Sequence, residues 1–167
     1  MSITNSLAVA LALTMLWNTP GHAQCASDPA KVAKTFYTQH HDFYLEDPKA
    51  VSALVAPRLL MSLKLEHACP QGELCAIEAV PWTDAQDGEI VEPIYFKTVE
   101  QTAMNAVVEM RYTFVLDKSD QRQQQIHLVF ERSKLSACWL LSDLVGSRGN
   151  SLVDEIEHWH KEFRNGL

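Results

Sequence analysis

The sequence predicts an α+β domain in which N-terminal helices pack on a curved antiparallel sheet and a further helix ends the chain. Two observations lead to this prediction. Apolar residues recur at three- and four-residue steps over residues 29–67, as they do on amphipathic helices. Over residues 90–145 they alternate with polar residues, as in half-buried strands, and short turns separate the last three strands. Helices followed by a run of strands are typical of this class.

Residues 1–23 are predicted to be a secretory signal peptide. The apolar run at residues 7–17 is shorter than the about 20 residues that span a bilayer, and small residues follow at the two positions that a signal peptidase reads. An uncleaved anchor is one alternative, because no Lys or Arg precedes the run. Lipidation of Cys25 is another, although the apolar and small residues expected before a lipidated cysteine are missing. We expect one domain, residues 24–167, with no membrane span after cleavage.

The four cysteines of the chain all remain after this cleavage, which fits an oxidising compartment. Cys69 and Cys75 enclose a short loop that contains a proline and a glycine, so we expect them to form a disulfide. Cys25 would then pair with Cys138 and tie the mature N-terminus to a late strand. A metal site is the alternative, but zinc cysteines are usually two to four residues apart. We therefore predict two disulfides, no metal and no cofactor.

Three helical segments are expected in the first half. Asp28 is the N-cap of the first helix and Pro29 its first residue, and the helix runs to about residue 45. Its buried stripe comprises Val32, Phe36, His40, Phe43 and Tyr44. A short second helix is expected over residues 48–55. The third runs over residues 57–67, because the residue before a proline is disfavoured in a helix.

Four strands and a final helix are expected in the second half, the strands over residues 90–99, 104–116, 124–132 and 137–145. Pro93 marks an edge or a bulge in the first strand. The second strand alternates most clearly, and the residues expected to face the core are Val108, Met110, Tyr112, Phe114 and Leu116. In the last strand we expect Trp139, Leu141 and Asp143 on one face and Cys138, Leu140, Ser142 and Leu144 on the other.

The final helix follows a glycine-containing loop and is capped by Asn150 or Ser151. Its predicted apolar face comprises Leu152, Ile156, Trp159 and Phe163. His158 and His160 are two residues apart, so on a helix they point about 200° away from each other and cannot hold one metal ion together. We interpret the two histidines as part of an exposed face.

The junction between the two halves contains the main candidates for a ligand or partner site. These are Trp82, Asp84, Gln86 and Asp87, to which the first helix adds His40 and Tyr44. The two aspartates have three interpretations: they cap their own turn, they face a ligand or partner, or they act as paired carboxylates in catalysis. A histidine on an apolar stripe is either a hydrogen-bonded core residue or a polar group in a pocket.

Composition and missing motifs exclude several classes of function. The formal net charge of −7 does not favour binding to nucleic acid, which is itself negatively charged. The chain contains no GxSxG elbow, no glycine-rich phosphate loop and no HExxH pair. These absences weigh against the common hydrolytic, nucleotide-using and zinc-dependent enzymes.

The chain as a whole resembles a family of small exported bacterial proteins of unknown function, many of them lipoproteins, with an NTF2-like (cystatin-like) cone fold. The matching segments are the signal peptide, Phe36-Tyr37 and Tyr44, a Leu-rich helical segment, residues 82–87, three alternating strands, residues 139–144 and residues 150–152. Residues 84–87 are the most specific element. The resemblance implies a sheet wrapped around the first helix with a concave pocket, and it implies no activity.

We expect a periplasmic, non-enzymatic protein that binds a small ligand or a protein partner in the envelope. One form of this hypothesis is an immunity-type inhibitor of an exported toxin, since an acidic protein suits a basic partner. The alternative is an NTF2-like enzyme in which Asp84 or Asp87 forms an acid–base pair with His40. A purely structural envelope protein is the third interpretation. The sequence predicts no oligomeric state.

Overall fold

The computed structural model describes residues 27–70 and 75–164 and confirms the α+β class. The predicted signal peptide and Cys25 lie outside these residues. The elements in chain order are α1 (Pro29–Gln39), α2 (Pro57–His67), β1 (Glu89–Gln101), β2 (Asn105–Val115), β3 (Gln121–Arg132), β4 (Trp139–Val145), α3 (Leu152–Trp159) and the π-helical η1 (His160–Arg164). Asp28 caps α1 as predicted, because its carboxylate accepts a hydrogen bond from the Ala30 N–H at 3.0 Å.

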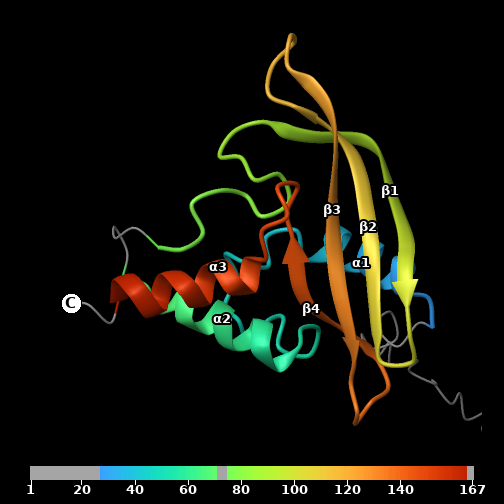
Figure 1. Cartoon of the computed structure of the whole chain (residues 1–167), viewed down its shortest axis with the longest axis vertical. Helices are drawn as coiled ribbons and strands as arrows, with labels where there is room; N and C mark the ends of the chain where they lie inside the picture. Colours follow the sequence, from blue (N-terminus) through green and yellow to red (C-terminus); the bar gives the residue numbers. More distant parts are fainter. Residues whose placement is uncertain (1–26, 71–74, 165–167) are drawn as a thin grey trace, which may run out of the picture.

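The four strands form one antiparallel sheet in the order β1-β2-β3-β4, which is a meander (Figure 1). β2 and β3 pair without interruption from Asn105↔Glu131 to Val115↔Gln121. β1 is an edge strand, and its pairing with β2 is interrupted between Val91 and Tyr95. Pro93 lies in this interruption, where its missing N–H does not remove a ladder hydrogen bond. The predicted irregularity of the first strand is therefore confirmed.

The helices cover the sheet in two groups. α1 packs on β1 and β2, whereas α2 and α3 lie side by side and pack against β4 (Figure 1). Large buried side chains fill the space between these layers: Phe36, Phe43, Leu59, Trp82, Met110, Tyr112, Phe114, Ile126, Leu128, Phe130, Trp139 and Leu141. The predicted core residue Leu116 is an exception at 47% exposure, because it lies beyond the end of β2.

α1 is shorter than predicted, because the chain leaves the helix after Gln39. Residues 40–46 form turns in which Phe43 N donates to His40 O at 3.1 Å and Leu45 N donates to Asp42 O at 2.8 Å. In a continued helix the carbonyl oxygen of His41 would accept from residue 45. It accepts instead from the indole N–H of Trp82 at 2.6 Å. A tertiary hydrogen bond therefore replaces the last helical turn.

The predicted short helix over residues 48–55 is wrong, because this segment forms turns that lead to the edge of β4. Leu141 N donates to Leu54 O at 3.0 Å, and Ala56 N donates to Leu141 O at 2.8 Å. Val55 thus forms a parallel bridge with Leu141. Pairing with β4 requires extended backbone here. α2 then begins at Pro57 and ends at His67, as predicted.

A β-bulge changes the alternation of β4. The register shifts between Val129↔Asp143 and Phe130↔Leu141, which leaves Ser142 as the extra residue. Leu141 and Leu144 are consequently both buried, at 0% and 1% exposure, although they were expected on opposite faces. Beyond the bulge, the Asp143 carboxylate accepts hydrogen bonds from Leu144 N, Val153 N and Ser151 Oγ at 2.8, 3.2 and 2.6 Å.

We expect Asp143→Ala to lower the free energy of unfolding by about 1–3 kcal/mol, because donors at the start of α3 lose a charged acceptor. Urea unfolding monitored by circular dichroism measures the change. Asp87→Ala is the matched control, because Asp87 is exposed and forms no hydrogen bond within the described residues, and it should change stability by less than about 0.5 kcal/mol. Equal stability of the two variants would contradict the role assigned to Asp143.

Candidate functional site

A long connection over residues 75–88 runs from the end of α2 past α3 to the start of β1 (Figure 1). Its centre is a tight loop, in which Val80 N donates to Ala85 O at 3.0 Å while Thr83 N and Asp84 N both donate to Val80 O. Asp84 has a φ of 53°, a left-handed conformation that aspartate adopts more readily than most residues. The predicted junction between helices and sheet is therefore an ordered loop.

Trp82 anchors this loop in the core and is not available as a surface contact. Its side chain is 0% exposed and packs against the rings of Tyr37, His41 and Phe43, with centroid distances of 5.1, 5.9 and 5.6 Å. Its indole N–H is satisfied by the carbonyl oxygen of His41. A tryptophan buried with its polar atom paired contributes mainly to stability.

Tyr112 of β2 holds the backbone of Trp82 in place. Its hydroxyl contacts both Trp82 O and the side-chain amide of Gln124. The hydroxyl has one proton, and Trp82 O can only accept it. The side-chain oxygen Oε1 of Gln124 lies 3.0 Å from the same hydroxyl, so two acceptors share this one donor. Burial, and secondarily the nearby Asp84 charge, raise the pKa of Tyr112 well above its ordinary value.

Asp84 ties the loop to the turn before α3. Its Oδ2 accepts from Ser147 Oγ at 2.8 Å and from Arg148 N at 3.2 Å, and it lies 3.8 Å from Arg148 Nε. A Cβ on Gly146 would collide with this carboxylate, so the close approach requires glycine. The predicted capping role is thus corrected: Asp84 satisfies donors in a distant turn and none in its own.

The other candidates in the junction lie on the surface. Gln86 and Asp87 are both exposed. The Asp84 side chain is 15% exposed, and its carboxylate is bound by Ser147 and Arg148. Asp84 and Asp87 therefore do not share a proton or a partner.

The two candidates from the first helix lie at its C-terminal end. The His40 ring packs against Phe36 at 5.6 Å, and its Nδ1 lies 4.0 Å from Glu46 Oε2. Within the described residues it forms no hydrogen bond or ion pair with either aspartate of the junction. Tyr44 is half-buried beside Phe43, and burial, more than the nearby charge of Asp42, raises its pKa. The structure does not bring these residues together with Asp84.

A groove of about 380 Å³ lies between the connection and α3. The lining residues are Ala76, Ile77, Glu78, Ala79, Val80, Pro81, Asp84, Gln86, Arg148, Leu152, Glu155, His158 and Trp159. Two of the predicted site residues, Asp84 and Gln86, are among them. The connection thus forms one wall of the groove, and one stripe of α3 forms the other.

The faces of α3 make different contacts, which leaves one face available to line the groove. Val153, Ile156 and His160 face the core and are buried. Asp154 and Glu157 form ion pairs with Arg58 of α2 at 2.8 and 2.7 Å. The remaining stripe faces the groove. The prediction of an exposed His160 is wrong, and the signal that identifies it as buried is its step of seven residues from Val153.

The charge in the groove is predominantly negative. Asp84 and Arg148 offset each other. Glu78 is exposed and forms no hydrogen bond or ion pair within the described residues, whereas Glu155 accepts from Asn150 Nδ2 at 2.8 Å. The half-buried Trp159 lies on the same stripe of α3. A groove lined by carboxylates and an aromatic side chain is suited to an ammonium or guanidinium group.

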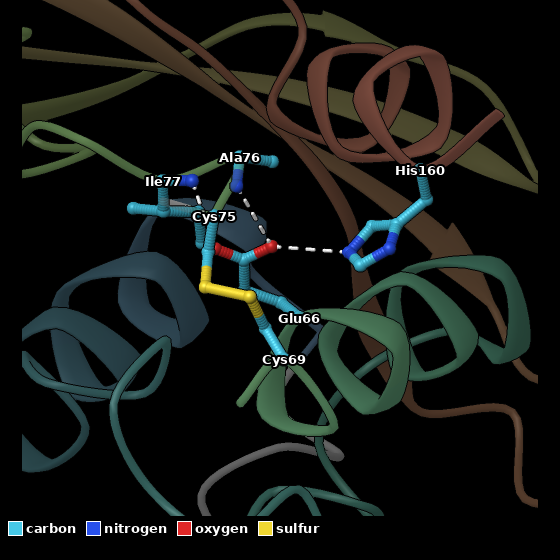
Figure 2. The surroundings of a disulfide bond; sticks show 6 residues. All are labelled: Glu66, Cys69, Cys75, Ala76, Ile77 and His160. Atoms are coloured by element: carbon cyan, nitrogen blue, oxygen red, sulfur yellow. Dashed lines mark hydrogen bonds and ion pairs between the residues drawn. A yellow bond between two sulfur atoms is a disulfide. The ribbon is translucent and has the colours of Figure 1, made fainter. Parts of the chain in front are cut away.

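The groove wall that the connection over residues 75–88 forms is linked to α2 at its beginning, as Figure 2 shows. The predicted Cys69–Cys75 disulfide is confirmed, with Cα atoms 6.2 Å apart. Glu66 accepts from Ala76 N at 3.2 Å and Ile77 N at 2.8 Å. Cys138 is also disulfide-bonded, but its predicted partner Cys25 lies outside the described residues, so that pairing stays a prediction.

Comparisons with known proteins add no assignment: no protein-family model matches the chain, and no curated protein matches it. In the described part of the chain, no group of three or more His, Cys, Asp or Glu side chains could hold a metal ion. The helices within residues 27–70 and 75–164 are too short or too polar to cross a membrane.

We expect Tyr112→Phe to lower the free energy of unfolding by about 1–2 kcal/mol, because the buried Trp82 carbonyl loses a donor. The variant should also be less sensitive to alkali. Because the pKa of Tyr112 is raised in the folded protein, the unfolded state releases this proton first, and wild-type stability falls above about pH 10. Denaturant unfolding at neutral and alkaline pH measures both effects.

Tyr95→Phe is the control for this experiment, because the Tyr95 side chain is 62% exposed. It should leave stability at neutral pH nearly unchanged. Tyr37 and Tyr44 also have raised pKa values, so part of the alkaline sensitivity remains in the Tyr112 variant. A Tyr112→Phe protein as stable as wild type at both pH values would show that the hydroxyl does not hold the loop.

Proposed function

We propose that the protein is an exported, periplasmic, non-enzymatic binding protein with an NTF2-like cone fold. The predicted signal peptide supports export, and the Cys69–Cys75 disulfide is of the kind that persists in oxidising compartments. The meander sheet with α1 against one face supports the cone fold. Trp82 and its aromatic neighbours fill the space between α1 and the sheet, so the contact surface lies on the outside, at the groove.

The partner is a basic segment of another envelope protein, as an immunity-type inhibitor of an exported toxin would require. The observation that carries this proposal is that Glu78, Glu155 and the half-buried Trp159 line the same groove. Asp84 adds no net charge because Arg148 neutralises it. A lysine or arginine side chain entering the groove would pair with these two carboxylates and lie against the indole. The overall charge of −7 favours encounter with such a partner.

The geometry does not support the alternative hypothesis of an enzyme with an acid–base pair. General acid–base catalysis needs the two groups to converge on one substrate. His40 lies at the end of α1 beside Phe36, whereas Asp84 is bound to the turn before α3.

We expect the double variant Glu78→Gln/Glu155→Gln to bind a fluorescein-labelled hexalysine peptide about tenfold more weakly than wild type, since each partly exposed ion pair contributes up to about 1 kcal/mol. Fluorescence anisotropy at low and high salt measures the affinity, and binding should weaken as salt rises. Glutamine keeps the shape of the side chain and the acceptor for Asn150, so the fold should persist.

A matched double variant, Glu89→Gln/Glu100→Gln, changes two exposed carboxylates of β1 outside the groove. Its affinity for the peptide should stay within about twofold of wild type. If both double variants lose affinity equally, binding reflects net charge alone and the groove is not the site. The same conclusion follows if neither variant loses affinity.

A further inference from the structure

The first residues of the groove wall are held to the last turn of α2 by one covalent and two hydrogen-bonded links. Cys69 lies two residues after the end of α2, and its disulfide partner Cys75 is the first residue of the connection that forms the wall. Glu66 then receives the N–H groups of Ala76 and Ile77 (Figure 2). The start of the wall is thus linked to α2, and the side chains of Ala76 and Ile77 also pack against the hydrophobic core.

Glu66 also connects the wall to the end of α3. Its Oε2 lies 3.3 Å from Nε2 of His160, the first residue of η1 (Figure 2). The two side chains are only 9% and 5% exposed. One carboxylate therefore joins α2, the start of one groove wall and the C-terminal end of α3.

Both cysteines of the disulfide are partly exposed, as is Glu66, whereas His160 is buried. The bridge closes a short loop with a sequence separation of 6. A short closure restricts the unfolded chain less than a long one does, so the fold depends on this bridge less than on a long-range bridge.

The far end of the wall has independent anchors. Trp82 is buried under α1, and Asp84 is bound to Ser147 and Arg148. None of these contacts involves the disulfide. Opening the bridge would therefore release the beginning of the wall, including Glu78, while the junction loop and the sheet stay in place.

We propose that the Cys69–Cys75 disulfide is a redox-sensitive brace that holds the groove in its binding form. Reduction frees residues 75–79, weakens their hydrogen bonds to Glu66 and lowers the affinity of the groove for a cationic segment. This inference rests on the proposed function insofar as the groove is the binding site. The protein would then bind its partner in an oxidising compartment and lose affinity in a reducing one.

The reaction is thiol–disulfide exchange with a dithiol reductant. A thiolate of the reductant attacks one sulfur of the bridge, the Cys69–Cys75 bond breaks, and a mixed disulfide forms. The second thiol of the reductant resolves the mixed disulfide. The products are two cysteine thiols in the protein and one disulfide in the reductant, so two electrons and two protons pass to the protein.

Amide hydrogen exchange measured by mass spectrometry tests the brace without any partner. Cys69→Ser/Cys75→Ser isolates this bridge, because a chemical reductant would also act on Cys138. We expect exchange at the hydrogen-bonded amides of Ala76 and Ile77 to accelerate about tenfold or more, while the amides of β2 and β3 stay within about twofold of wild type. Unchanged protection of these two amides would overturn the proposal. Loss of protection throughout β2 and β3 would also overturn it, because it would show that the disulfide stabilises the whole fold.

Hexalysine binding by the same variant separates the two proposals. We expect the serine variant to bind the peptide at least about fivefold more weakly than oxidised wild type. If oxidised wild type itself does not bind the peptide, the proposed function fails, while the exchange result still decides whether the brace exists. If wild type binds and the serine variant binds equally well, the redox inference fails and the proposed function stands.

Discussion

Two hydrogen bonds of Trp82 determine how the two halves of the molecule fit together. Its indole N–H binds the carbonyl oxygen of His41, and its own carbonyl oxygen receives the hydroxyl of Tyr112. The residue thereby connects the end of α1 to the centre of β2 while its ring fills the space between them. Buried polar groups are costly when unpaired, so each partner specifies the position of the others.

The groove follows from this arrangement. With Trp82 buried, the chain on either side of it is directed to the surface: residues 76–81 lie along α3, and Asp84 reaches the turn before that helix. The wall is therefore held at both ends, by α2 through Glu66 and by the core through Trp82. Glu78 is the carboxylate between these anchors, and its side chain stays exposed because the backbone N–H groups of Ala76 and Ile77 and the ring of Trp82 hold this part of the wall.

Much of this fold follows from local signals in the sequence. Asp28 with Pro29, and Pro57, define where helices begin, and the alternation around Met110 defines β2. Three features depend on distant partners and were not predictable locally. The His41 carbonyl leaves the helix for Trp82, Val55 becomes extended because it pairs with Leu141, and a bulge at Ser142 reverses the alternation of β4.

The site was predictable to a smaller extent. The sequence predicts a site at the junction between the two halves, and Asp84 and Gln86 of that junction do line the groove. The sequence could not show that Trp82 points inward, because a tryptophan in a polar stretch suits either a surface or a core position. Glu66 and Arg148 were missed because their roles come from residues that are distant in the sequence.

We infer that Trp82 is a structural anchor and that the adjacent groove contacts the partner. Nuclear magnetic resonance of the indole N–H groups during titration with hexalysine tests it most directly. We expect the Trp159 resonance to shift progressively, while the Trp82 resonance stays in place and its N–H proton exchanges slowly with solvent, as its bond to His41 requires. A shift of Trp82 with no response from Trp159 would contradict it.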